Sequence, residues 1–98
     1  LDQAASGSVA LDIGAGHGAL VIYPDDRYRD QEIEISRIQD EGRRVHTGVH
    51  ERATQAGSVL AAIFGSLPAG EYRIRADATT PGPVVSVPEA AVAELTLS

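Results

Sequence analysis

The chain of 98 residues suffices for one domain but not for two hydrophobic cores, so we expect a single domain over residues 1–98 with a loose lead-in at 1–7. Its net charge of −6 argues against nucleic acid or an anionic membrane surface as a partner, because both need clustered positive charge. Cysteine and lysine are absent, which excludes disulfides, thiol nucleophiles, cysteine-based zinc sites and Schiff-base lysines.

No apolar run approaches the roughly 20 residues that a helix needs to cross a bilayer, so we expect a soluble chain without a membrane span. The lack of cysteine suits a reducing compartment and favours the cytoplasm. The chain begins at Leu1 and contains no methionine, so an exported protein that has lost a signal peptide is the alternative.

In chain order, the predicted elements are short strands in which apolar and polar side chains alternate, separated by glycine, proline or aspartate turns. They cover residues 8–13, 19–23, 32–36, 43–52, 59–64, 72–76, 84–87 and 92–97. The clearest turn is Leu67-Pro68-Ala69-Gly70, where proline fixes φ and glycine can take a positive φ. A helix over 88–95 is the alternative to the last strand, because good helix formers follow a proline suited to a first turn.

About eight strands, with a turn signal every eight to twelve residues, predict an all-β fold. We expect an antiparallel β-sandwich of seven or eight strands. The apolar positions of the alternating segments predict its core: Val9, Leu11, Ile13, Leu20, Ile22, Ile33, Ile35, Val45, Val49, Ile63, Phe64, Leu67, Tyr72, Ile74, Val85, Val87, Leu95 and Leu97.

One motif suggests an enzyme. Residues 11–20 read Leu-Asp-Ile-Gly-Ala-Gly-His-Gly-Ala-Leu, which resembles the first glycine-rich motif of class I S-adenosylmethionine-dependent methyltransferases. That resemblance implies a cofactor-binding turn and places Glu34 near the family's ribose-binding acid. The motif must open a helix, however, whereas the residues that follow are β-branched and end at Pro24. We therefore predict a glycine-rich hairpin between strands 8–13 and 19–23, and no cofactor.

The three histidines are the candidate metal ligands. His46 and His50 are four residues apart, which on a strand separates them by roughly 13 Å, too far to share one ion. They share the face opposite the predicted core, so a solvated polar face is expected. A metal site would need His17, or a carboxylate such as Glu51, to converge on one of them.

A second resemblance concerns the fold. Phe64 and the run Leu67-Pro68-Ala69-Gly70-Glu71-Tyr72-Arg73-Ile74 resemble the signature of transthyretin-like (prealbumin-like, Ig-like) sandwiches, such as carboxypeptidase regulatory domains and B-type repeats of collagen-binding adhesins. Many such repeats carry a Lys–Asn isopeptide bond, which this chain cannot form because it has neither residue. The whole chain also resembles small actinobacterial proteins, and this likeness implies no particular activity.

We therefore predict a non-catalytic binding or structural module rather than an enzyme. Its expected partner is another protein, or a second copy joined through sheet edges. No nucleophile–base arrangement or catalytic carboxylate pair is recognisable. The alternatives are a methyltransferase-like enzyme fragment that uses the glycine turn, and a metal-binding module that uses His17, His46 and His50.

Overall fold

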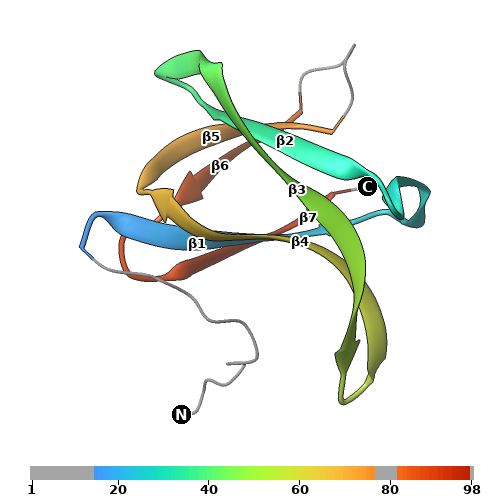
Figure 1. The fold of residues 1–98 in the computed structure, drawn as a ribbon. Helices are drawn as coiled ribbons and strands as arrows, with labels where there is room; N and C mark the ends of the chain where they lie inside the picture. The colour runs from blue at the N-terminus through green and yellow to red at the C-terminus, as the bar shows by residue number, and fades with distance from the viewer. Residues whose placement is uncertain (1–14, 77–81, 98) are drawn as a thin grey trace.

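The structure is a computed structural model that describes residues 15–76 and 82–97. Its elements are β1 (His17–Pro24), a 3-10 turn η2 (Asp26–Tyr28), β2 (Glu32–Arg37), β3 (Asp40–Thr54), β4 (Gly57–Pro68), β5 (Gly70–Arg75), β6 (Val84–Val87) and β7 (Val92–Leu97) (Figure 1). The predicted all-β class is confirmed. The helix considered over 88–95 is wrong, because these residues form a turn and β7.

The seven strands form one mixed sheet in the order β6-β5-β2-β3-β4-β1-β7. Every neighbouring pair is antiparallel except β1 and β7, which run parallel from Ala19 beside Val92 to Pro24 beside Leu97. The expectation of a wholly antiparallel arrangement is therefore wrong at this pair. Alternation along a strand shows which face it buries, but not the direction of the strand beside it.

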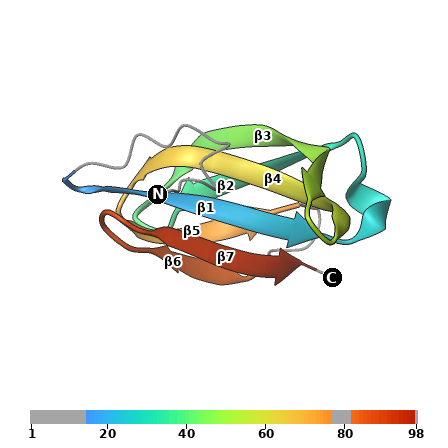
Figure 2. The ribbon, with the colours of Figure 1, turned by 90° about the horizontal axis from the view of Figure 1, so that it is seen from below.

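The sheet curls until its two end strands, β6 and β7, lie near each other, so that it almost closes as a barrel (Figure 2). The connection between these strands is tied to the start of β1, since Ala90 N–H donates to His17 O (2.6 Å) and Ala19 N–H donates to Ala91 O (3.0 Å). Two separate layers and a prealbumin-like arrangement are not confirmed, because β3 joins both halves into one sheet.

The core is aliphatic, with Tyr72 and Phe64 as its aromatic members. Its buried residues are Leu20, Ile22, Ile33, Ile35, Val49, Ala62, Phe64, Leu67, Tyr72, Ile74, Val87 and Leu97, with Val85 and Leu95 partly buried against them. Val45 is 42% exposed, so its assignment to the core is wrong. Ile63 is half-buried, and Val9, Leu11 and Ile13 lie outside the described residues.

The predicted turn after Leu67 is confirmed as a tight bend. Only Ala69 separates β4 from β5, and Gly70 has φ 150°. Because β4 and β5 are not neighbours in the sheet, the bend carries the chain across the core rather than closing a hairpin. Tyr72 Oη donates to Pro68 O (2.6 Å) and fixes the bend from the inside.

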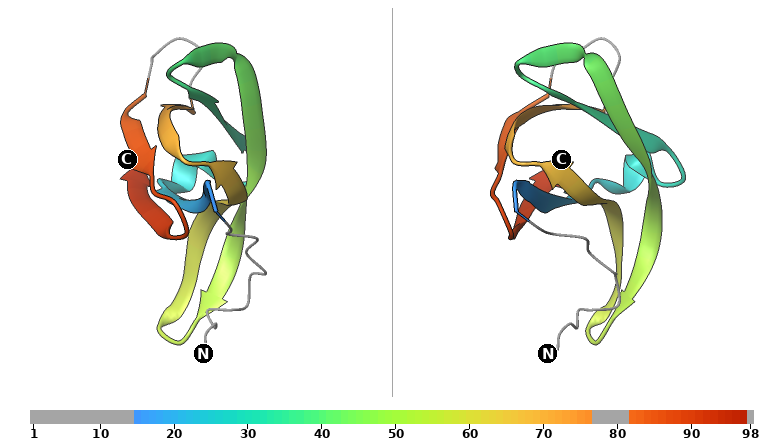
Figure 3. Two further views of the ribbon diagram at one scale, coloured as in Figure 1. Left: turned by 90° about the vertical axis from the view of Figure 1, so that its left-hand side faces the viewer. Right: turned by 60° about the vertical axis from the view of Figure 1, so that its left-hand side comes forward.

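A two-stranded arm extends from the body of the sheet (Figure 3). It consists of Val49–Thr54 of β3 paired with Gly57–Ala62 of β4, and the predicted turn at 54–57 forms its tip. All residues from 50 to 59 are exposed. An isolated hairpin is marginal in water, so the arm depends on its buried base at Val49 and Ala62.

Candidate functional site

The two longest strands stay paired over only part of their lengths. β3 and β4 pair from Val49 opposite Ala62 out to the tip of the arm. Before Val49, β3 pairs with β2, and after Ala62, β4 pairs with β1. We call the diverging segments, residues 43–48 of β3 and 63–68 of β4, the β3–β4 fork (Figure 3). Within residues 15–76 and 82–97, no strand pairs with either inner edge of this fork.

The direction of one amide shows which backbone groups face the fork. Val49 N–H donates to Gln31 O (2.8 Å), on the β2 side of β3. Backbone groups of an antiparallel strand point alternately to its two sides. The N–H and C=O groups of Arg44, His46 and Gly48 therefore point into the fork. By the same alternation, the backbone N–H and C=O groups of Ala62 point toward β1, and those of Ile63 point into the fork.

The outer face beside the fork is charged, and its inner face is apolar. Arg44 Nη1 lies 3.3 Å from Glu34 Oε1, and His46 Nδ1 lies 3.2 Å from Glu32 Oε1. Val45 lies on the same face of β3 as the buried Val49, but 42% of it is exposed. An extended segment entering here would meet backbone groups that no described strand pairs with, an apolar side chain on one face, and arginine and histidine side chains on the other.

An arginine cluster continues this charged face toward β5. Glu41 is shared by Arg75 (2.8 Å to Nη2) and Arg73 (3.7 Å to Nε). Arg75 Nε also donates to Oγ of Ser36 (3.0 Å), which is completely buried. Because Glu41 of β3 contacts two arginines of β5, and Arg75 also contacts Ser36 of β2, the cluster ties β2, β3 and β5 together.

The structure does not bring the histidines together as metal ligands. His46 pairs with Glu32, and His17 Nδ1 lies 3.4 Å from Ala15 O at the start of β1. The ring of His50 lies over Gly48, where an added Cβ would be 2.7 Å from its Nε2. Within the described ranges, no group of three or more His, Asp or Glu side chains could hold a metal ion.

The part of the glycine motif that lies within the described residues, from Ala15 on, has a structural explanation. Ala15 and Gly16 form a turn, and His17–Pro24 is a strand rather than the helix that a nucleotide-binding turn must open. A Cβ on Gly18 would overlap the carbonyl oxygen of Pro88, so this glycine permits the close approach of the β6–β7 connection. Glu34, which the methyltransferase resemblance places near that family's ribose-binding acid, pairs with Arg44.

The first strand of the hairpin predicted from the motif, residues 8–13, lies outside the described residues. Its second strand, 19–23, is confirmed as part of β1, which pairs with β4 on one edge and with β7 on the other. Both partners are distant in sequence, although strands that are neighbours in sequence often pair in space.

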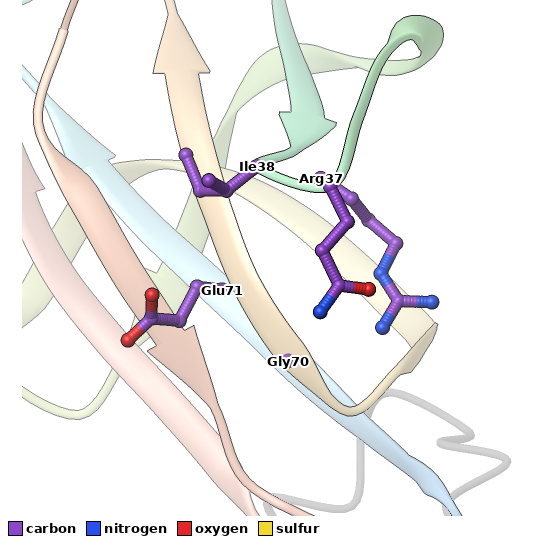
Figure 4. A pocket seen from close by; sticks show the side chains of 5 residues that line it. Arg37, Ile38, Gly70 and Glu71 are labelled. Carbon is purple, nitrogen blue, oxygen red and sulfur yellow. The ribbon is translucent and has the colours of Figure 1, made fainter.

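A small hollow lies at the β2–β3 turn, lined by Arg37, Ile38, Gln39, Gly70 and Glu71, with a volume of about 270 Å³ (Figure 4). Gly70 lies between the side chains of Arg37 and Glu71 in this view. Arg37 Nη2 already donates to Ala69 O (3.2 Å), and Ile38 N–H donates to Glu71 O (3.0 Å). The volume falls below that of typical ligand sites, so the hollow is not a convincing binding pocket.

Two tyrosines have perturbed acidities. Burial raises the pKa of Tyr72 above 10.0, and the positive charge of Arg37 partly offsets this. Burial also raises the pKa of Tyr23 above 10.0, together with the hydrogen bond and the negative charge of Glu94. Both shifts move the pKa values of the phenols further from neutral pH, so neither shift supports a role as general acid or base at physiological pH.

The fork was not anticipated from the sequence, although a signal for it exists. β3 is 15 residues long, whereas its partner β2 has 6. A strand so much longer than its neighbour must change partners or leave an edge unpaired. The turns predicted at 39–42 and 54–57 lie far enough apart for such a long strand between them. The alternation of its side chains, however, does not indicate which strands pair with it.

None of the helices in the described ranges is both long and apolar enough to cross a membrane. Comparison of the chain with protein-family models, with curated proteins and with solved structures gives no match in any of the three.

Proposed function

We propose that the protein is a non-catalytic binding module that takes up an extended segment of a partner protein at the β3–β4 fork. The observation that carries this proposal is that β3 and β4 pair only from Val49 and Ala62 out to the tip of the arm and diverge on the other side of that pair, which leaves two edges without a paired strand among the described residues. Edges of this kind bind extended peptides by adding a strand, with main-chain hydrogen bonds for affinity and alternate side chains for specificity.

The residues around the fork define the peptide that would fit. The side chains facing inward would meet Val45 and need to be apolar, whereas the outward ones would lie beside Arg44 and His46 and can be polar or acidic. Inward-pointing apolar residues alternating with outward-pointing polar or acidic ones are therefore the expected ligand pattern.

Our proposal also includes a more specific fold than the all-β class. We place the chain near the transthyretin-like sandwiches, with β6, β5, β2 and the start of β3 facing the rest of β3, β4, β1 and β7. Burial of Phe64, Leu67 and Tyr72 around the proline–glycine bend supports this assignment. An actinobacterial source and a cytoplasmic location are predictions from the sequence.

The test selects peptides from a displayed random library on the immobilised full chain and measures the affinity of a selected peptide by calorimetry. His46→Pro removes one N–H that points into the fork, whereas the matched variant His46→Ala removes the same side chain and keeps that N–H. We expect His46→Pro to weaken binding at least tenfold and His46→Ala to retain it. Proline is tolerated on an edge strand, and circular dichroism checks that each variant is folded.

A second pair, Arg44→Pro and Arg44→Ala, repeats the comparison if His46→Pro does not fold. Equal affinity of the proline and alanine variants would refute binding through the fork. So would a selected peptide that slows amide exchange elsewhere but not at Arg44, His46 and Gly48.

A further inference from the structure

We propose that the protein forms a two-fold symmetric dimer in which the outer edge of the arm's β4 segment, residues 57–61, pairs antiparallel with the same edge of a second copy. This inference goes beyond the proposed function, because the outer edge of the arm and the β3–β4 fork are different parts of the sheet. The strand that each arm would gain belongs to the described part of the other chain.

The arm has two outer edges that pair with none of the described strands. On β3, pairing with β2 ends at Gly48, and Val49 N–H still donates to Gln31 O, so residues 50–54 have an unpaired edge. On β4, pairing with β1 ends at Ala62, so residues 57–61 also have an unpaired edge. Residues 50–59 are exposed, and the arm projects from the body of the sheet (Figure 3). Each outer edge can therefore accept a further strand.

The two outer edges differ in their protection. Charged side chains, proline and bulges are the features by which natural sheets keep other strands from an edge. The β3 edge carries Glu51 and Arg52, and Glu51 lies 3.7 Å from Arg29. The β4 edge, residues 57–61, has no charged residue and no proline, and its register with β3 is regular. The β4 edge is therefore the one that an additional strand would join.

The backbone groups that point outward from this edge are those of Ser58 and Leu60. Ala62 points its N–H and C=O groups toward β1, where it pairs with Ile22. By alternation along the strand, Leu60 and Ser58 point their groups to the same side, whereas Val59 points its groups toward β3. An added strand would thus form its hydrogen bonds with Ser58 and Leu60.

These groups complement themselves about a two-fold axis. When Val59 lies opposite Val59 of the second copy, Ser58 of each copy lies opposite Leu60 of the other, and each such pair exchanges both of its N–H···O bonds. A self-complementary patch is what a two-fold dimer requires. The equivalent register of the β3 edge would place Arg52 opposite Arg52, where like charges destabilise the pairing. The backbone geometry therefore favours a second copy joined through β4.

The side chains agree with this register. Val59 is a large apolar residue that is 36% exposed, and on the axis it would meet its own copy in a non-hydrogen-bonded pair, the closer of the two pair types. Arg52 lies opposite Val59 on β3, so it would be three strand spacings, about 14 Å, from Arg52 of the second copy. Physiological salt screens charges at that separation. The pairing covers an apolar side chain and brings no like charges together.

The size of the contact sets its expected strength. Residues 57–61 form a short edge, whereas stable dimers bury about 800 Å² on each partner. We therefore expect a reversible dimer whose population rises with protein concentration, rather than an obligate one.

Sedimentation equilibrium of the full chain at concentrations up to about 1 mM tests for this dimer. Ser58→Pro removes an outward N–H from each copy and should weaken association about tenfold or more, whereas the matched variant Ser58→Ala keeps that N–H and should associate like the wild type. Proline is tolerated on an edge strand, and circular dichroism checks that both variants fold. A wild-type monomer at every concentration, species larger than a dimer, or equal association of the two variants would overturn the proposal.

A cysteine tests the register without a proline, because the chain has no cysteine of its own. Two Cα atoms in a non-hydrogen-bonded pair are about 4.5 Å apart, within the range of a disulfide. Val59→Cys should form a covalent dimer about tenfold or more faster on mild oxidation than Ala53→Cys, because pairing raises the effective concentration of the thiols. Ala53 is the matched control, since it is exposed on the β3 edge of the same arm. Equal rates for the two variants would contradict the register.

The failure of this inference can be told apart from the failure of the proposed function. Ser58→Pro should leave the affinity for a selected peptide unchanged, and His46→Pro should leave dimerisation unchanged. If the wild type is monomeric and still binds the peptide through the fork, the inference fails and the function stands. If the dimer depends on Ser58 but no peptide is selected, the function fails and the inference stands. Loss of the dimer in His46→Pro would place the contact at the fork and overturn the inference.

Discussion

Val49 and Ala62 face each other at the last pair that joins β3 to β4, and both side chains are completely buried. On one side of this pair the two strands continue together into the exposed arm. On the other side they diverge to β2 and β1. The pair therefore anchors the arm to the core and marks the closed end of the fork.

Val49→Ala should destabilise the protein by about 2 kcal/mol, because it removes two buried methyl groups and leaves space that the strands cannot fill. Val84→Ala is the control, since Val84 is 47% exposed and should change stability by less than about 0.5 kcal/mol. Urea unfolding measures both. Equal midpoints for the two variants would show that the base of the arm is not packed as described.

Among replacements of the described glycines by alanine, Gly18→Ala should destabilise the protein most. Its Cβ would overlap the backbone oxygen of Pro88, which cannot move aside without shifting the β6–β7 connection. We expect a loss of about 2 kcal/mol or more, seen as a lower melting temperature. Gly42→Ala is the matched control, because nothing lies within 4 Å of its Cβ position. A normal melting temperature for Gly18→Ala would place that connection elsewhere.

Gly70→Val should reduce stability more than Gly16→Val. Both glycines have positive φ, at 150° and 80°, but the Cβ at Gly70 would also lie 2.9 Å from Nη2 of Arg37, which would have to give up its hydrogen bond to Ala69 O in order to move. Space around Gly16 is open, so only the backbone strain remains there. Thermal unfolding of the two variants gives the order, and comparable melting temperatures would contradict it.

Tyr72 should make the fold sensitive to alkali. Because burial raises its pKa above 10.0 in the folded state, its contribution is complete below pH 10 and is lost as the pH rises through the folded-state pKa. The ionised phenol also cannot donate to Pro68 O. With no lysine or cysteine in the chain, few other groups titrate in this range.

Tyr72→Phe should therefore lower stability by about 1 kcal/mol at pH 7 through the lost hydrogen bond and should flatten the decline above pH 10. Denaturant unfolding between pH 8 and 11.5 measures both effects, with Tyr28→Phe as the control. An unchanged alkaline slope in Tyr72→Phe would rule out Tyr72 as its source.

Several features of the fold could be predicted from particular residues. Alternation located β6 at 84–87 and β7 at 92–97 with the bounds that the structure gives. It also identified Ile33 and Ile35 as core residues, because consecutive side chains of a strand face opposite sides. Val45 broke the rule although its pattern matched that of Val49. Val45 lies on the inward face, but it belongs to the part of β3 that does not pair with β4.

The candidate site could not be predicted in the same way. The residues that the sequence singled out were His17, His46, His50 and the glycine turn, and the structure does not assemble them into one site. His46 does border the fork, but through its backbone groups rather than its imidazole. A free strand edge consists of groups that every residue carries, so side-chain identity gives almost no indication of it.

By itself, the sequence determined the all-β class, the positions of most strands, the inward face of each of these strands except β4, and the bend at Pro68 and Gly70. These features depend on neighbours along the chain, through side-chain alternation and restricted backbone angles. Tertiary structure alone decided the partners: β7 parallel to β1, β5 beyond β2, and β3 passing from β2 to β4 at Val49. Pairing depends on backbone groups common to all residues and on packing between distant segments. The fork, which is a consequence of pairing, could therefore be recognised only in the folded chain.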